Sequence, residues 1–184
     1  DLLGVLEHRN NDGFSVRLPN RTLPNLEASL ACTMKFVRDL SLAYQAGPEG
    51  VALLCRLVMG GHLSSLHSLI LAFSNTSLTP AIACISSACS DGNLSALRTL
   101  RANHIGLPPV DGIQNLFTAW KLGAMPELRI LELQVMSLTD IDVQALAEAC
   151  VKGLGQLRQL SLSTNPFGDD GVAALISACA AGGL

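Results

Sequence analysis

The feature that most constrains the fold of this chain is an internal repeat. The stretch LRQLSLSTNPFGDDGVAAL, which begins at Leu157, has apolar residues at L-x-x-L-x-L spacing, followed by apolar residues at helical spacing. Related stretches begin at Val37, Leu66, Leu97 and Leu128, so successive copies are 29, 31, 31 and 29 residues apart. Because regular self-similarity is the signature of repeat architectures, each copy is expected to form one supersecondary unit.

Each copy has two halves with different periodicities. The first half alternates apolar and polar residues, which is typical of a short strand with one buried face. The second half places apolar residues three and four apart and therefore predicts a helix, as at Val143, Leu146 and Cys150. Helix starts are expected at Thr79-Pro80 and at the acid–glycine pairs Glu49-Gly50, Asp111-Gly112 and Asp170-Gly171. Helix ends are expected at left-handed glycines, namely Gly60-Gly61, Gly92, Gly123 and Gly153.

One strand and one helix cannot enclose a core alone, so neighbouring units must bury it together. The strands then form one parallel sheet, and the helices cover its outer side. Helices are about 10 Å wide whereas strands are about 4.8 Å apart, so the stack is expected to bend with the sheet inside. The periodicity therefore predicts an α/β solenoid with a parallel sheet on its concave face and helices on its convex face.

The best-preserved copy resembles a known repeat family. Leu157, Leu160, Leu162, Asn165 and Phe167 fit the pattern LxxLxLxxNxL of leucine-rich repeat proteins of the ribonuclease-inhibitor type. That resemblance implies a horseshoe built from units of about 29 residues, each with a true helix. The Asn does not recur in the other copies, whose equivalent residues are Gln45, Ser74, Ile105 and Met136. Their turns are expected to have fewer hydrogen bonds from side chain to backbone.

The repeat also sets the expected domain boundaries. Five units are expected at 37–65, 66–96, 97–127, 128–156 and 157–184. Residues 1–36 fit poorly and are interpreted as a degenerate N-terminal repeat or flank, with a strand near Val16. Because terminal repeats need a polar cap and none is visible, missing repeats or other chains are expected to cover both ends.

Composition limits the class of partner. The net charge is −3 and no run of like charges occurs, so neither nucleic acid nor a membrane is an expected partner. The longest apolar run, which begins at Val51, is interrupted by Arg56 and is too short to cross a bilayer.

The cysteines are interpreted as small apolar core residues. Cys89, Cys150 and Cys179 occupy one helical position of the repeat, where another copy has Trp120. The remaining three are Cys32, Cys55 and Cys84. Free buried thiols indicate an intracellular, reducing compartment. Three N-x-S/T sequences, at Asn20, Asn75 and Asn93, favour the alternative of a secreted chain.

No catalytic motif stands out, so the chain is not expected to be an enzyme or to hold a metal or cofactor. The histidines, at His8, His62, His67 and His104, lack partners at ligand spacing. The pair Asp169-Asp170 could form a carboxylate dyad, but its place before a predicted helix favours stabilisation of that helix N-terminus.

Residues between the strand leucines are expected to form the binding face. One basic residue follows the first apolar position of each copy, giving Arg38, His67, Arg98, Arg129 and Arg158. A second column, after the third apolar position, holds Tyr44, Phe73, His104, Val135 and Thr164. Beside these columns stand Ile70, Arg101, Ile130, Glu132 and Ser161. Arginine with aromatic side chains is typical of interface centres, although a merely solvated edge is the competing interpretation.

The resemblance implies a non-catalytic module that binds a protein partner on its concave face, and it is compatible with a subunit of a larger assembly. It leaves open a GTPase-activating regulator similar to Ran GTPase-activating proteins, or the ligand-sensing repeats of an immune-type receptor. A structural filler held by its ends and a tropomodulin-like actin cap are further alternatives.

Overall fold

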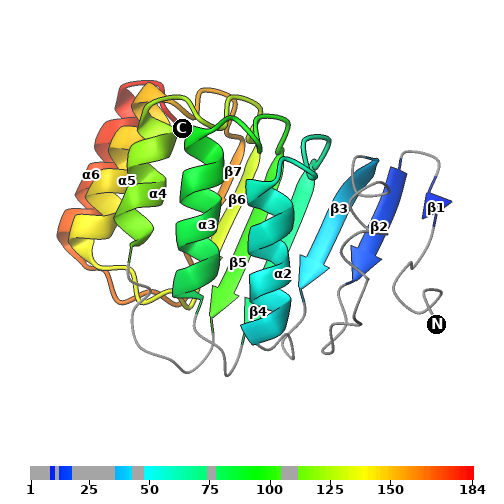
Figure 1. The fold of residues 1–184 in the computed structure, drawn as a ribbon. Helices are drawn as coiled ribbons and strands as arrows, with labels where there is room; N and C mark the ends of the chain where they lie inside the picture. Colours follow the sequence, from blue (N-terminus) through cyan, green and yellow to red (C-terminus); the bar gives the residue numbers. More distant parts are fainter. Residues whose placement is uncertain (1–8, 11–12, 18–35, 43–47, 74–77, 105–111) are drawn as a thin grey trace.

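The computed structural model describes residues 9–10, 13–17, 36–42, 48–73, 78–104 and 112–184. These residues form an α/β fold with one seven-stranded sheet whose strands follow their order in the chain. Figure 1 shows the strands side by side, with the helices of this part of the chain in one layer on one face of the sheet. We call the opposite face of the sheet the open face.

Strands and helices alternate along the chain. The strands are β1 (Arg9–Asn10), β2 (Gly13–Arg17), β3 (Val37–Leu42), β4 (Ser68–Phe73), β5 (Thr99–His104), β6 (Ile130–Gln134) and β7 (Gln159–Ser161). The helices are α2 (Pro48–Met59), α3 (Thr79–Ser90), α4 (Ile113–Lys121), α5 (Asp140–Lys152) and α6 (Asp169–Ala180). β1 and β2 pair antiparallel, and every later neighbour pairs in parallel. The predicted strand near Val16 is β2, which lies beside β3.

The core lies between the sheet and the helix layer. Leu40, Leu69, Leu100 and Leu131 align across four adjacent strands and are almost fully buried. The helices add apolar residues at the predicted positions, including the buried side chain of Leu146. The expectation that strand and helix halves bury a shared core is therefore confirmed for these units.

Glycines end several helices, as predicted, because they adopt a left-handed conformation. The φ angles of Gly61, Gly92 and Gly123 are 67°, 74° and 83°. Gly153 also ends its helix, as predicted, but its φ of −136° is not left-handed, so that part of the prediction is wrong. A Cβ atom there would lie 1.7 Å from the carbonyl oxygen of Trp120, so glycine is required for close approach of two backbones.

Helix starts differ in detail from the expectation. Helix α3 has Leu78 as its N-cap, so Thr79 already lies in the helix instead of capping it. Helix α6 begins at Asp169, which puts Asp170 in its first turn and not before it. Two carboxylates at a helix N-terminus stabilise it through the helix dipole, in line with the favoured interpretation of this pair.

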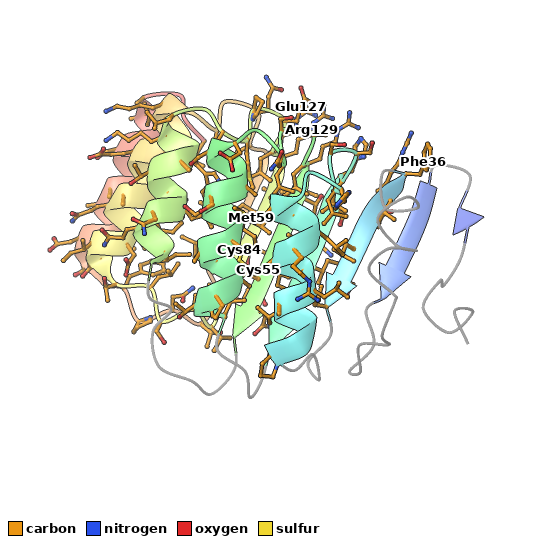
Figure 2. The ribbon with its side chains drawn as sticks, in the orientation of Figure 1. Phe36, Cys55, Met59, Cys84, Glu127 and Arg129 are labelled. Carbon is orange, nitrogen blue, oxygen red and sulfur yellow. A yellow bond between two sulfur atoms is a disulfide. The ribbon has the colours of Figure 1, made fainter. Side chains whose placement is uncertain are left out.

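The cysteines fulfil the core prediction only in part. Cys89 and Cys150 are buried, as expected, and free. Cys179 is exposed, because within the described residues no helix packs beyond α6. Cys55 and Cys84 are wrongly predicted as free thiols: they form a disulfide between α2 and α3 (Figure 2). Cys32 lies outside the described residues.

The disulfide follows from the repeat itself. Cys55 and Cys84 are 29 residues apart, so they occupy the same position on two adjacent helices, and their Cα atoms are 5.4 Å apart. That separation is within the range that a disulfide needs. The free-thiol argument for a reducing compartment therefore does not extend to this pair. Separately, no helix in the described part of the chain is long and apolar enough to cross a membrane.

Candidate functional site

The five predicted basic residues form one row along the edge where the strands begin, which we call the basic row. Its members are Arg38, His67, Arg98, Arg129 and Arg158. The backbone N–H of His67 donates to the carbonyl of Arg38 at 2.7 Å, and the next three members repeat this bond at 2.8 Å. One basic side chain per strand is therefore held in register by the backbone and does not depend on side-chain packing.

The side chains of the basic row differ in exposure and pairing. Those of Arg38, Arg98 and Arg158 are exposed. Arg129 is half-buried, and its guanidinium lies 3.7 Å from the Glu127 carboxylate; Figure 2 shows the two residues where β6 begins. Its Nε has no hydrogen-bond partner among the described residues. The row is a cationic edge. The charge of Arg129 is only partly neutralised, because an exposed ion pair of this kind contributes little.

The residues between the paired strand leucines form a column across the middle of the open face. Ile70, Arg101 and Glu132 are consecutive partners in the sheet register, flanked by Ser41 and Ser161. Arg101 Nε lies 3.2 Å from Glu132 Oε2, with 44% and 19% of the two side chains exposed. The same carboxylate accepts a hydrogen bond from Gln159 Nε2 at 3.4 Å. The charge of Arg101 is therefore already compensated within the sheet.

Apolar side chains lie beside this ion pair. Ile70 and Ile130 are both half-buried, and Ile130 is next to Thr99 and Gln159 in the register. Neither side chain belongs to the core that the helices cover, because each alternates with buried leucines along its strand. The open face thus combines branched aliphatic residues with a fixed polar pair.

The predicted column of Tyr44, Phe73, His104, Val135 and Thr164 lies only partly within the described residues. Tyr44 lies outside the described residues. Phe73 and His104 end β4 and β5 and are register partners, although their side chains are outside the described part. Val135 and Thr164 have left-handed φ angles of 57° and 60°, so the strand alternation stops there and these residues belong to turns.

One column on the open face was not predicted from the sequence. Ala72, Asn103 and Gln134 directly follow the third apolar position and are aligned in the register. Gln134 Nε2 donates to Ser161 Oγ at 3.4 Å. Asn103 Oδ1 is buried and has no hydrogen-bond partner among the described residues. The period-two alternation itself contained this signal, since the residue after a buried leucine faces the other side.

No group of three or more histidine, cysteine or acidic side chains in the described segments could hold a metal ion. No protein-family model matches this chain, and a comparison with curated proteins finds no match either.

Proposed function

We propose that this chain is a leucine-rich repeat protein of the ribonuclease-inhibitor type that binds another protein on the open face of its sheet, without catalysing a reaction. The observation that carries the proposal is the register of Ile70, Arg101 and Glu132, which places an aliphatic side chain beside a preformed ion pair on the face that no helix of the described residues covers. The motif around Asn165 supports the family assignment.

The chemistry of the open face fits a protein partner. Interface centres combine apolar side chains with arginine and satisfied polar groups. Here Ile70 and Ile130 provide apolar area, and Arg101 is held in place by Glu132. Because the strands are fixed before binding, little ordering cost opposes association.

The basic row defines the partner more closely. Three exposed arginines at one edge favour an acidic segment on the partner that runs along the starts of the strands. Complementary charge of this kind chiefly raises the association rate and sets orientation, whereas the apolar centre contributes affinity. Binding is therefore expected to weaken as salt concentration rises.

The free thiols also support a compartment for the proposed protein. Cys89 and Cys150 are free and buried, which favours an intracellular, reducing setting as part of the proposal. Cys55 and Cys84 are then expected to be free thiols in the cell, and their disulfide is expected to form on exposure to oxidant. Alkylation of freshly lysed native source, followed by mass spectrometry of both cysteines, tests this; a fully oxidised pair would place the chain in an oxidising compartment.

The binding experiment compares two matched sets of variants. Partners are captured from the native source with the wild-type chain, with Ile70→Glu/Ile130→Glu, and with Leu122→Glu/Ile141→Glu. The control pair lies on the helix layer and is already exposed, at 83% and 66%. We expect the Ile70→Glu/Ile130→Glu variant to lose the partners and the Leu122→Glu/Ile141→Glu variant to keep them. Both variants should have the circular dichroism spectrum of the wild-type chain. If the Ile70→Glu/Ile130→Glu variant keeps the partners, the binding site lies elsewhere.

A further inference from the structure

A groove lies between α5 and α6, on the side of the helix layer that faces away from the sheet. Figure 1 shows the two helices next to each other. The groove has a volume of 350 Å³, which is within the range of small-molecule sites. Its floor is formed by Ala147, Ala174 and Ala178, and the exposed side chains of Val151 and Lys152 line one wall. The middle of the groove is therefore apolar.

The preceding pair of helices is closed at the equivalent place by two polar bridges. Lys121 Nζ on α4 donates to Glu148 Oε2 on α5 and forms an ion pair with it. Gln114 Nε2 on α4 donates to Asp142 Oδ1 on α5 at 3.1 Å. Both bridges cross from one helix to the next, so their side chains cover the line along which α4 and α5 meet.

The α5–α6 pair has lost the residues that would form these bridges. The counterparts of Lys121 and Glu148 are Val151 and Ser177, which cannot form an ion pair. The counterpart of the acceptor aspartate is Gly171, which has no side chain. Ser177 Oγ donates instead to a carbonyl of its own helix at 2.9 Å. Small residues at these positions leave the groove open, which explains why it lies here and not between α4 and α5.

The two ends of the groove have opposite charge. At the end where α5 stops, Lys121 and Lys152 lie near one carboxylate. The hydrogen bond and charge of Lys121, and then the charge of Lys152, lower the pKa of the Glu148 carboxyl. Two cations beside one anion make this end positive. At the other end, α6 begins with Asp169 and Asp170, which make that end negative.

We infer that this groove binds a free, linear monocarboxylate with an apolar chain, such as a medium-chain fatty acid. The chain lies along the alanine floor and the carboxylate lies at Lys152, away from the acidic end. Apolar burial contributes most of the affinity, and the exposed lysine selects the sign of the ligand's charge. An α-helix is about 10–12 Å wide with its side chains, so it would rest on the rims and leave the alanine floor uncovered.

The test is a titration of the whole ¹⁵N-labelled chain with decanoate, below the concentration at which decanoate forms micelles, followed by NMR. We expect saturable shifts of the Ala174 and Ser177 amides. Decylamine has the same chain with a positive head group and should bind several-fold more weakly. Lys152→Glu should reverse this preference. Absence of saturable shifts at the groove, or equal affinity of the wild-type chain for decanoate and decylamine, overturns the inference.

A matched pair of variants tests the position of the apolar chain. Ala174→Leu fills the groove and should weaken decanoate binding about tenfold or more. Ala173→Leu makes the same change at an exposed neighbour outside the lining, and should bind like the wild-type chain. Equal losses in both variants contradict the assignment. If the spectrum shows that Ala174→Leu does not fold, the result with Lys152→Glu decides.

This site is independent of the open face, which lies on the other side of the sheet. Ile70→Glu/Ile130→Glu should therefore bind decanoate like the wild-type chain, and decanoate should not displace a protein from the open face. The two proposals can thus fail separately.

Discussion

The side chain of Asn165 hydrogen-bonds the backbone of Met136, although the two residues are in different units. The Asn165 Oδ1 atom accepts the backbone N–H of Met136 at 2.9 Å, and its Nδ2 donates to the Leu133 carbonyl at 2.7 Å. Met136 occupies the position where the motif expects Asn, and its side chain is buried among apolar residues. One asparagine therefore stabilises the turn of the preceding unit as well as its own.

Changing Asn165 to alanine is expected to destabilise the fold by about 1–3 kcal/mol, because several backbone groups lose their partner. Asn165→Asp keeps the acceptor for Met136 and Leu138 but removes the donor to Leu133 and Leu162. It should be no more stable than the alanine variant, since a carboxylate then faces two carbonyls. Urea unfolding measures both. If the alanine variant is as stable as the wild-type chain, the turn does not depend on this amide.

Gly171 and Asp140 are expected to be energetically coupled. Gly171→Ala introduces a Cβ 2.8 Å from Asp140 Oδ1, so the carboxylate must move and lose its hydrogen bond to the backbone. Each single change, Gly171→Ala or Asp140→Ala, should cost about 1–3 kcal/mol. The loss in the free energy of unfolding for the double variant should be smaller than the sum of the two single losses, because both residues belong to one hydrogen-bonded contact. Additive free energies of unfolding would show that the two residues act independently.

The Cys55–Cys84 disulfide is expected to stabilise the oxidised chain. It closes a loop with a sequence separation of 29, for which the chain-entropy relation gives about 3–4 kcal/mol. Cys55→Ala/Cys84→Ala should lose most of that difference, and reduction of the wild-type chain should reproduce the loss. Cys179→Ala is the control, since this exposed thiol is free. Equal unfolding midpoints for oxidised and reduced protein would contradict the prediction.

Stability should fall at alkaline pH because of two buried thiols. Burial raises the pKa of Cys89 and of Cys150 from 9.0 to about 12. Below pH 9 both thiols are protonated in the folded and unfolded states, so their contribution is fully present. Between 9 and 12 only the unfolded chain releases these protons, so stability falls as pH rises, by at most about 1.4 kcal/mol per pH unit for each thiol.

Chemical denaturation at several pH values tests this linkage. Cys89→Ala/Cys150→Ala should start less stable, because buried volume is lost, but should show a shallower decline above pH 9. Parallel declines for the wild-type chain and the double variant would mean that other groups cause the alkaline loss.

The regular parts of the fold could be predicted from sequence because they rest on periodicity. The alternation around Leu131 and the three–four spacing at Val143 each match a single secondary-structure period, and both residues are buried in the structure. The left-handed glycine at Gly92 was predictable for the same reason, since few other residues adopt that conformation.

The errors concern contacts between units, which a pattern within one unit does not contain. Gly153 is required by the approach of the Trp120 carbonyl, which belongs to another helix. Cys55 and Cys84 form a disulfide only because adjacent helices bring equal positions together. Cys179 matches the pattern of Cys150 but lacks a covering helix in the described residues.

The candidate site was predicted as columns of residues but not as interactions. The register that aligns Ile70 with Arg101 follows from their equal positions within the L-x-x-L-x-L pattern of successive copies. The pairing of Arg101 with Glu132 depends on side-chain conformation across two strands, which spacing alone does not specify. The left-handed turn at Val135 was not predicted either, because a β-branched residue rarely adopts that conformation.

Site-specific photo-crosslinking tests the central claim, that the open face binds a protein partner. A photoreactive amino acid replaces Ile130 on the open face in one chain and Ile141 on the helix layer in another, and each chain is irradiated with extract of the native source. We expect a covalent adduct of one partner from position 130 and none of that partner from position 141. A partner that crosslinks from position 141 and not from position 130 would contradict it.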